Sequence, residues 1–398
     1  MKRLIRLTAA ALAFITFISV SAIYASAAPC CDDAYNEEYI PASLSVSARS
    51  AILIEASTGD VIYEYNADEM LPMASTTKIM TALVVLESCA LDERVTITEK
   101  SVGIEGSSLY LRAGETLTVE DLLYGLLLQS ANDAATALAI YCAGSVENFA
   151  ALMNEKAASL GCESTHFTNP HGLDDDEHRT TSRELANITA HALENETFRK
   201  IVSTKEHEIP DGDGGMRILF NHNRLLRENE DVIGVKTGYT MRSGRCLVSA
   251  AERDGVRVIA VTLSDPDDWN DHREMLSYGL DAYEHRVLAG ENSLVYAVPV
   301  TGGVKNFVTV KNAEAVSLIL PAGSDELTLK IELDAFYFAP IKKGAVLGRA
   351  VWVDGNGNEA ASVSLIADED NFMREVRGLF EKILEKFGIH RAEARRQK

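Results

Sequence analysis

The chain is poor in basic residues, and this shortage excludes one class of function at the outset. Its 398 residues include 38 Lys and Arg against 59 Asp and Glu, which gives a formal net charge of −21. Nucleic-acid-binding proteins carry a basic surface for the phosphates, so no nucleic-acid partner is expected. After the N-terminus, no run approaches the roughly 18–20 apolar residues of a membrane-spanning helix. No H-E-x-x-H pattern occurs among the nine histidines, so no metal site is predicted.

Cysteine is also scarce and irregularly spaced. The six cysteines match no zinc or redox spacing except for the adjacent pair Cys30-Cys31. Either lipidation or disulfide formation is open to that pair. The other four are predicted to be small buried hydrophobic residues rather than a disulfide framework: Cys89, Cys142, Cys162 and Cys246.

The N-terminus has the pattern of an export signal. Lys2, Arg3 and Arg6 precede an apolar run, and residues 25–27 form a small-x-small cleavage site. An uncleaved anchor helix is the alternative. We therefore expect residues 1–27 to be a signal peptide and residues 28–45 a linker. The protein is expected to be exported and to lie peripherally on the extracytoplasmic face of the cell membrane.

In residues 46–284, strand patterns lie at both ends and helical patterns in the middle. Two strand-like runs flank residues 57–60, and a long hairpin turns at Asp254-Gly255. Between them, a capping box at residues 118–121 opens one helix and Gly144 closes another. The economical arrangement is an α+β domain, with one antiparallel sheet built from both ends of the segment and helices packed on it.

Two further segments follow this domain. Residues 285–368 alternate or carry β-branched residues between turns, which predicts a separate small all-β domain. Residues 369–398 carry one apolar helical stripe, which includes Phe372, Met373 and Phe387, and end in basic residues. This amphipathic helix either packs on the β domain or lies in the membrane interface, where apolar burial and anionic lipid would bind it. The reversal to basic charge on an acidic protein favours the membrane.

The stretch "ASTTKIM" at residues 74–80 places a serine and a lysine on one helical face, ahead of an apolar run. The Ser75 hydroxyl is a poor nucleophile unless a base removes its proton. Burial lowers the pKa of a lysine, so Lys78 is suited to be that base. Backbone N–H groups at a helix N-terminus can hold an oxyanion. The pattern S-x-x-K alone, however, occurs by chance in most proteins of this size.

Two further motifs make the pattern specific. Residues 130–132, Ser-Ala-Asn, lie at a break between two predicted helices. Residues 236–238, Lys-Thr-Gly, are predicted at the end of a strand, where glycine lets a substrate approach the backbone closely. The order S-x-x-K, S-x-N, K-T-G is that of serine penicillin-recognising enzymes. Over nearly the whole mature chain, the sequence resembles a D-alanyl-D-alanine carboxypeptidase, a low-molecular-mass penicillin-binding protein. The stretches "PMASTTKIMTAL", "THFTNPHGLDDDEH" and "GVKTGYTMRSGRCLVSAA" support this resemblance.

The resemblance implies a catalytic domain of the serine β-lactamase/DD-peptidase type and a set of catalytic roles. Ser75 would attack the carbonyl between the two terminal D-alanines of a peptidoglycan stem peptide, and Lys78 would take its proton. Ser130 and Lys236 would relay a proton to the leaving D-alanine nitrogen. Water would hydrolyse the acyl-enzyme without a cofactor or a metal. Penicillin and other β-lactams would acylate the same serine.

The resemblance also implies residues that bind the substrate. Asn132 would hydrogen-bond the substrate backbone, and Thr237 would hold the terminal carboxylate. Gly238 would let the substrate approach the backbone of the strand closely. The N–H groups of Ser75 and Tyr239 would form the oxyanion hole. Some relatives add an arginine before the K-T-G motif for the carboxylate. The similar stretch here, "NHNRLL", contains His222 and Arg224. Either of them, or neither, could bind the carboxylate, so that role is left open.

Three other functions share parts of this pattern. A class A β-lactamase needs a deacylating glutamate in E-x-x-L-N, but Leu-Asn occurs nowhere in the chain, and such enzymes lack the β domain and anchor. A DD-endopeptidase would use the same residues to cut peptidoglycan cross-links, and the C-terminal domain favours the carboxypeptidase. A non-catalytic envelope-binding module would keep the fold without turnover, although all the motif residues are present.

Overall fold

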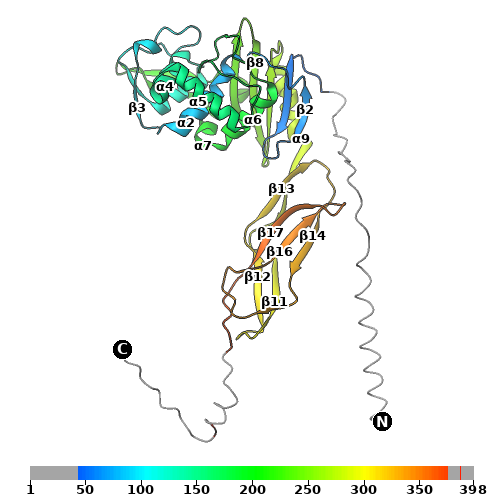
Figure 1. The fold of residues 1–398 in the computed structure, drawn as a ribbon. Helices are drawn as coiled ribbons and strands as arrows, with labels where there is room; N and C mark the ends of the chain where they lie inside the picture. Colours follow the sequence, from blue (N-terminus) through cyan, green and yellow to red (C-terminus); the bar gives the residue numbers. More distant parts are fainter. Residues whose placement is uncertain (1–43, 375–385, 387–398) are drawn as a thin grey trace, which may run out of the picture. The chain divides into compact units, whose positions relative to one another are not determined.

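The structure is a computed structural model that describes residues 44–374 and Lys386. Its first domain is built on a five-stranded antiparallel sheet in the order β2-β1-β9-β8-β7 (Figure 1). The predicted union of both ends of the segment in one sheet is confirmed, because β1 pairs with β9. The strands are β1 (Ser50–Glu55), β2 (Val61–Tyr65), β7 (Val232–Thr240), β8 (Gly244–Arg253) and β9 (Val256–Leu263).

Both faces of this sheet are covered, which explains why β1 is apolar along most of its length. Ile52 and Ile54 pack into one core, whereas Ala51 and Leu53 point the other way into a second core. The helices of the first core are α2 (Lys78–Ser88), α3 (Val119–Leu128), α4 (Asn132–Ala143), α5 (Val146–Ser159), α6 (Ser182–Glu194) and α7 (Glu196–Ser203). Those of the second are α8 (Leu225–Glu228) and α9 (Asp268–Ala282).

Two helix boundaries follow the signals in the sequence. The Thr118 hydroxyl accepts from the backbone N–H of Asp121, whose carboxylate accepts from the N–H of Thr118, so the predicted capping box opens α3. Gly144 adopts a φ of 79° at the end of α4. In the described part of the chain no single helix has the length and apolar composition of a membrane span. One pair, α4 with α5, passes that test together but is bent by 84°.

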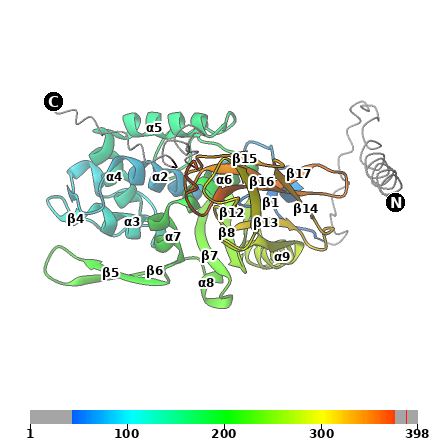
Figure 2. The ribbon, with the colours of Figure 1, turned by 90° about the horizontal axis from the view of Figure 1, so that it is seen from below.

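Short strands complete the first domain. β3 (Arg94–Thr96) pairs with β4 (Thr116–Thr118), and β5 (Glu206–Pro210) pairs with β6 (Met216–Phe220). The β5–β6 hairpin extends from the body of the domain and contacts α3 (Figure 2). The hairpin, α6, α7 and α9 were not anticipated from the sequence.

The second domain is all-β, as predicted. Its six-stranded sheet has the order β14-β16-β17-β12-β11-β15, and β10 pairs with β13 in a separate ribbon. Trp352, Val310 and Leu365 are buried in its core. The strands are β10 (Tyr283–Ala289), β11 (Val295–Thr301), β12 (Phe307–Asn312), β13 (Val316–Pro321), β14 (Thr328–Leu333), β15 (Tyr337–Phe338), β16 (Val346–Val353) and β17 (Glu359–Ala367).

The chain leaves this domain in an extended form. Asn371 and Met373 make isolated β-bridges to Ile341 and Gly303, and the N–H of Val304 donates to the carbonyl of Phe372 at 2.9 Å. The expected amphipathic helix therefore does not begin at residue 369, because backbone pairing holds residues 371–374 against the β domain. Apart from Lys386, the remainder of the predicted helix lies outside the described residues, as do the predicted signal peptide and most of the linker.

Candidate active site

Ser75 lies in a tight turn at the start of a buried helix. Residues Ala74–Thr77 form a 3₁₀ turn that runs directly into α2. Ala74 adopts a φ of 48°, a left-handed conformation that costs energy for a residue with a Cβ. The turn is held closely, because a Cβ at Gly172 would lie 1.9 Å from the Ala74 carbonyl oxygen and one at Gly238 would lie 3.0 Å from the Ser75 nitrogen.

Lys78 is fully buried, and its ammonium group faces Ser75. Its Nζ lies 2.9 Å from the Ser75 Oγ, 2.7 Å from the Asn132 Oδ1 and 2.6 Å from the His171 carbonyl oxygen. Burial lowers the pKa of Lys78 well below its ordinary value, and the positive charge of Lys236 lowers it further. The neutral amine is therefore accessible under conditions in which an exposed lysine stays charged.

The Ser130–Asn132 motif lies in the predicted position, between α3 and α4. Ser130 is 5% exposed and has a φ of 59°, so, like Ala74, it is a non-glycine residue in the left-handed region. Asn132 is the first residue of α4 and links three segments. Its Oδ1 accepts from Lys78, its backbone N–H donates to the Ser107 carbonyl at 2.7 Å, and its side-chain amide donates to the Glu105 carbonyl at 2.5 Å.

The loop that carries Ser107 is tied to α4 by a buried carboxylate. Asp133 accepts from the Ser108 hydroxyl at 2.6 Å and from the N–H groups of Leu109 and Leu111 at 3.0 and 3.1 Å. It is inaccessible to solvent. A buried carboxylate with these partners fixes the loop, because each partner would otherwise lose a hydrogen bond inside the protein.

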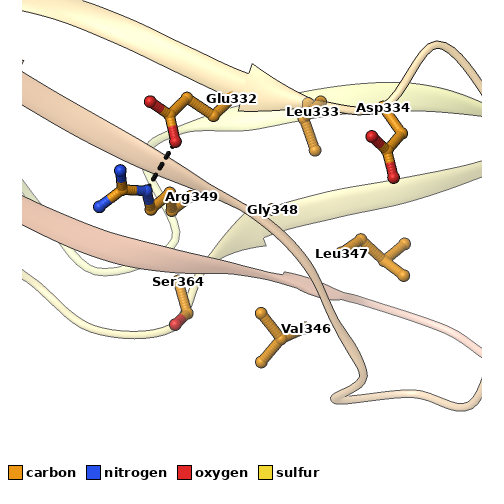
Figure 3. Close-up of a pocket in the computed structure, with 8 residues that line it drawn as sticks. All are labelled: Glu332, Leu333, Asp334, Val346, Leu347, Gly348, Arg349 and Ser364. Carbon is orange, nitrogen blue, oxygen red and sulfur yellow. Dashed lines mark hydrogen bonds and ion pairs between the residues drawn. The ribbon is translucent and has the colours of Figure 1, made fainter.

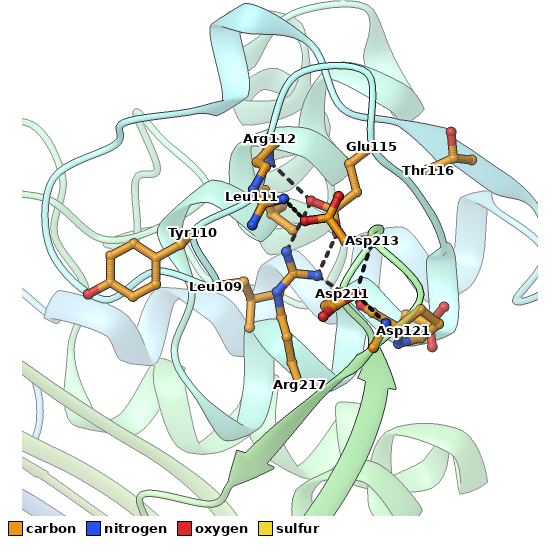
Figure 4. Close-up of polar contacts among 12 residues, drawn as sticks. Leu109, Tyr110, Leu111, Arg112, Glu115, Thr116, Asp121, Asp211, Asp213 and Arg217 are labelled. Atoms are coloured by element: carbon orange, nitrogen blue, oxygen red, sulfur yellow. Dashed lines mark hydrogen bonds and ion pairs between the residues drawn. The ribbon is translucent and has the colours of Figure 1, made fainter.

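The far end of the same loop is tied to the β5–β6 hairpin (Figure 4). The Arg217 guanidinium donates to both carboxylate oxygens of Glu115, at 2.5 and 3.1 Å, and the Glu115 side chain is 3% exposed. Arg112 pairs with Asp213 at the hairpin turn, where both side chains are exposed. The loop is thus held by α4 near residues 108–111 and by the hairpin at residues 112 and 115.

The Lys-Thr-Gly motif lies within β7 rather than at the end of a strand, so that part of the prediction is wrong. The pairing of β7 with β8 runs from Val232 to Thr240 and continues past the motif. Lys236 is 1% exposed, and burial lowers its pKa to about 7. Its Nζ donates to the carbonyl of Thr237 at 2.8 Å.

A cavity of about 320 Å³ brings much of the predicted site together. Ser75 lines the cavity, Lys78 contacts Ser75, and Asn132 contacts Lys78. Arg224 pairs with Glu228 at 3.2 Å and does not line the cavity. The predicted residues that line the cavity are Ser75, Ser130, His222, Thr237, Gly238 and Tyr239. The lining residues that the sequence analysis missed are Ser107, Arg245, Asp268 and Trp269.

Arg245 supplies a permanent positive charge to this cavity. It donates to the Asp268 carboxylate at 2.7 Å and lies over the Trp269 ring, 5.7 Å from its centroid. Its Nε is buried and has no hydrogen-bond partner within the described residues. Burial and the charge of Lys236 lower the pKa of His222 to about 4, so this histidine is neutral at neutral pH. Arg245 is thus better suited than His222 to attract an anion.

A second hollow lies in the β domain (Figure 3). Glu332 and Arg349 on its wall pair with each other at 2.6 Å. Within residues 44–374, no group of three or more His, Cys, Asp or Glu side chains is placed to hold a metal ion.

The fold and this cavity define a class of protein, namely the penicillin-recognising serine enzymes, in which a lysine rather than a histidine neighbours the nucleophile. Comparison with known families gives the particular group. The D-alanyl-D-alanine carboxypeptidase family, peptidase S11, matches residues 37–267, and the chain belongs to this family. The C-terminal domain of penicillin-binding protein 5 matches residues 283–371.

The chain is also similar to individual proteins and to a solved structure. The D-alanyl-D-alanine carboxypeptidase DacF of Bacillus subtilis is 34% identical over 337 residues, which cover 82% of this chain and 86% of the relative. A D-alanyl-D-alanine endopeptidase of Escherichia coli is 31% identical over 207 residues, or 51% of this chain and 66% of the relative. The crystal structure of penicillin-binding protein 5 from Haemophilus influenzae matches with a TM-score of 0.63 and 29% identity, over 82% of this chain and 98% of that one.

Proposed function

We propose that this protein is a serine D-Ala-D-Ala carboxypeptidase that removes the terminal D-alanine from peptidoglycan stem pentapeptides and is inhibited by penicillin. The observation that carries the proposal is the 2.9 Å contact between the Ser75 hydroxyl and the buried amine of Lys78. A neutral amine has two N–H groups and one lone pair. The two N–H groups match Asn132 and His171, which leaves the lone pair for the Ser75 proton.

Acyl transfer then proceeds in two steps. Lys78 takes the proton as the Ser75 Oγ bonds to the carbonyl carbon between the two D-alanines, and the N–H groups of Ser75 and Tyr239 bind the oxyanion. Ser130 and Lys236 relay a proton to the departing amine, and free D-alanine leaves. Water then attacks the ester, Ser75 regains its proton, and the shortened peptide is released.

Substrate binding uses the walls of the cavity. The Asn132 amide hydrogen-bonds the peptide backbone, Gly238 lets the peptide approach β7, and Thr237 receives the terminal carboxylate. We assign the cation for that carboxylate to Arg245, and to Lys236 in its charged form, instead of His222 or Arg224. The support is the permanent charge of Arg245 and the low pKa of His222.

Cleavage of cross-linked peptides is the second candidate, because an endopeptidase relative shares part of the sequence. The same residues would serve both reactions. The match of residues 283–371 to the C-terminal domain of a penicillin-binding protein 5 favours the carboxypeptidase. A protein acting on the cell wall must leave the cytoplasm, so we also propose export by residues 1–27 and peripheral membrane attachment by the C-terminal segment.

The test is D-alanine release by the full-length protein from a synthetic peptide that ends in Lys-D-Ala-D-Ala. We expect release by the parent protein, its inhibition by penicillin, and its loss in Ser75→Ala. Penicillin acylation without D-alanine release would overturn the carboxypeptidase. In that case, cleavage of cross-linked muropeptides would establish the endopeptidase.

A further inference from the structure

Two of the four cysteines that were predicted to be small buried hydrophobic residues lie against each other. The Sγ atoms of Cys89 and Cys142 are 2.7 Å apart, although the residues are 53 positions apart in the chain. Two thiols do not normally approach so closely, whereas a disulfide joins its sulfurs at about 2.05 Å. The two side chains are half-buried at the edge of the first core. In the structure both thiols are free, as expected without a disulfide framework, but they are half-buried rather than buried, and they contact each other.

The other two described cysteines provide an internal contrast. Cys162 and Cys246 are buried, and their sulfurs face backbone carbonyls at 3.7–3.9 Å rather than another sulfur. Their surroundings are those of small core residues. The juxtaposition of Cys89 and Cys142 is thus particular to that pair.

The pair joins the two helices that carry the central catalytic contact. Lys78 begins α2 and Asn132 begins α4, and these two side chains meet at 2.7 Å. Cys89 caps the end of α2, and Cys142 lies in the last turn of α4. The hydroxyl of Tyr141 also donates to Glu93 at 2.9 Å beside the sulfurs. The helices therefore run alongside each other with a contact at each end.

We propose that Cys89 and Cys142 form an intramolecular disulfide that clamps the ends of α2 and α4 remote from the catalytic residues. The oxidant is an external disulfide, on a thiol–disulfide oxidoreductase or on glutathione. A thiolate of one cysteine attacks it and releases one thiol, and the second thiolate attacks the mixed disulfide and releases the other. One S–S bond forms as one breaks, and two electrons and two protons pass to the oxidant.

The surroundings of the sulfurs determine when this bond forms. Burial raises the pKa of both thiols, so thiolates are scarce in the folded protein. We expect oxidation to occur while the chain folds after export, in a compartment that permits disulfides. The closed loop includes Ser107, Ser130 and Asn132, so the bond restricts the unfolded chain around the residues that build the cavity.

The chemical test is a peptide map of the full-length protein, secreted through an oxidising compartment, denatured, and alkylated before reduction. Trypsin places Cys89 in residues 79–94 and Cys142 in residues 113–156. We expect these two peptides to be joined and to separate on reduction, while Cys162 and Cys246 are alkylated at once. If both members of the pair are alkylated without reduction, even after incubation with oxidised glutathione, the proposal fails. A disulfide that links Cys89 or Cys142 to Cys30 or Cys31 would also overturn the proposal.

The second test measures how much the proposed disulfide stabilises the folded protein against heat. Reductant should lower the Tm of the parent protein by roughly 10 °C. It should not change the Tm of a Cys89→Ala/Cys142→Ala variant, and Cys162→Ala should respond like the parent. An equal response of parent and double variant would show that the pair is not the bond being reduced. Neither test depends on turnover, so its result is separate from that of the proposed carboxypeptidase activity.

Discussion

At the scale of single residues, the clustering of the motif residues could be predicted from the sequence, and part of the cavity lining could not. Ser75, Lys78 and Asn132 carry sequence motifs, and the structure joins them by direct contacts. Arg245 carries no motif. It reaches the cavity because the pairing of β7 with β8 sets it opposite Tyr239. The sequence predicted both strands but not their register, so this arginine could not be found from spacing alone.

The role assigned to Arg245 can be tested with a substrate that lacks the carboxylate. Arg245→Ala should lower kcat/KM for a peptide ending in free D-Ala-D-Ala by roughly 10–100-fold, because a charge-assisted hydrogen bond contributes about 1.5–3 kcal/mol. The same change should have little effect on the corresponding C-terminal amide. Arg224→Ala is the control, since Arg224 contacts the same Trp269 ring at 4.8 Å but does not line the cavity. An equal loss with both peptides would remove Arg245 from the carboxylate site.

The two buried lysines predict a bell-shaped pH profile for acylation. Lys78 must be neutral to accept the Ser75 proton, so the rate should fall at low pH as Lys78 becomes protonated. Lys236 attracts the substrate carboxylate only when charged. Because its pKa is about 7, kcat/KM should also decline as the pH rises through that value.

Lys236→Arg separates these two limbs, because arginine stays charged throughout the accessible range. Acylation by a fluorescent penicillin, measured from pH 4 to pH 10 by stopped flow, should keep its acid limb and lose the alkaline decline. An alkaline limb that persists near pH 7 in this variant would exclude Lys236 as its source.

At the scale of elements, the sequence predicts the helices and strands that have a regular pattern of apolar residues. β1, α3 and α4 follow that rule. α9 does not, because it also buries polar side chains that find partners through the fold. Asp271 accepts from the Ser47 backbone N–H at 2.6 Å, and His272 lies 3.0 Å from the Thr262 hydroxyl. Because these partners are distant in sequence, no local pattern predicts that Asp271 and His272 are buried.

The loop from Ser107 to Glu115 depends on one buried carboxylate more than on its surface ion pairs. Asp133→Ala should lower the free energy of unfolding by about 3 kcal/mol, because it leaves buried N–H groups of the loop without a partner. Acylation should slow at least tenfold, since Ser107 and Asn132 lose their support. Urea denaturation and penicillin acylation measure the two effects.

Asp213→Ala is the matched control for this loop. It removes the exposed pair with Arg112, at the same loop, and an exposed pair contributes about 0–1 kcal/mol. If Asp133→Ala were as mild as Asp213→Ala, the anchoring role of the buried carboxylate would be refuted.

At the scale of the whole molecule, the order of the parts could be read from the sequence, but the end of the β domain could not. The stripe that predicted a helix from residue 369 includes Phe372 and Met373, which instead lie extended beside the β domain. The two residues are 68% and 62% exposed. Backbone pairing with Gly303 and Ile341, which lie far away in sequence, outweighs the local helical period there.

Membrane attachment by the C-terminal segment remains a prediction from its sequence, and flotation with vesicles decides it. The full-length protein should bind vesicles that contain an anionic lipid and bind less at high salt, because Lys382, Lys386 and Arg391 are among its basic residues. A chain that ends at Arg374 should stay unbound and keep its D-alanine release. Phe380→Glu should weaken binding by roughly 10–100-fold, the loss expected when one buried aromatic side chain is replaced.

The competing arrangement, in which this segment packs on the β domain, predicts a different pair of results. Truncation at Arg374 would then lower the Tm of the protein, and vesicles would bind neither form.

The control for Phe380→Glu is Glu381→Gln, because Glu381 is a charged neighbour of Phe380 and is not part of the apolar stripe. Binding that survives Phe380→Glu but is lost on truncation would indicate attachment by charge alone, and the interfacial helix would be rejected.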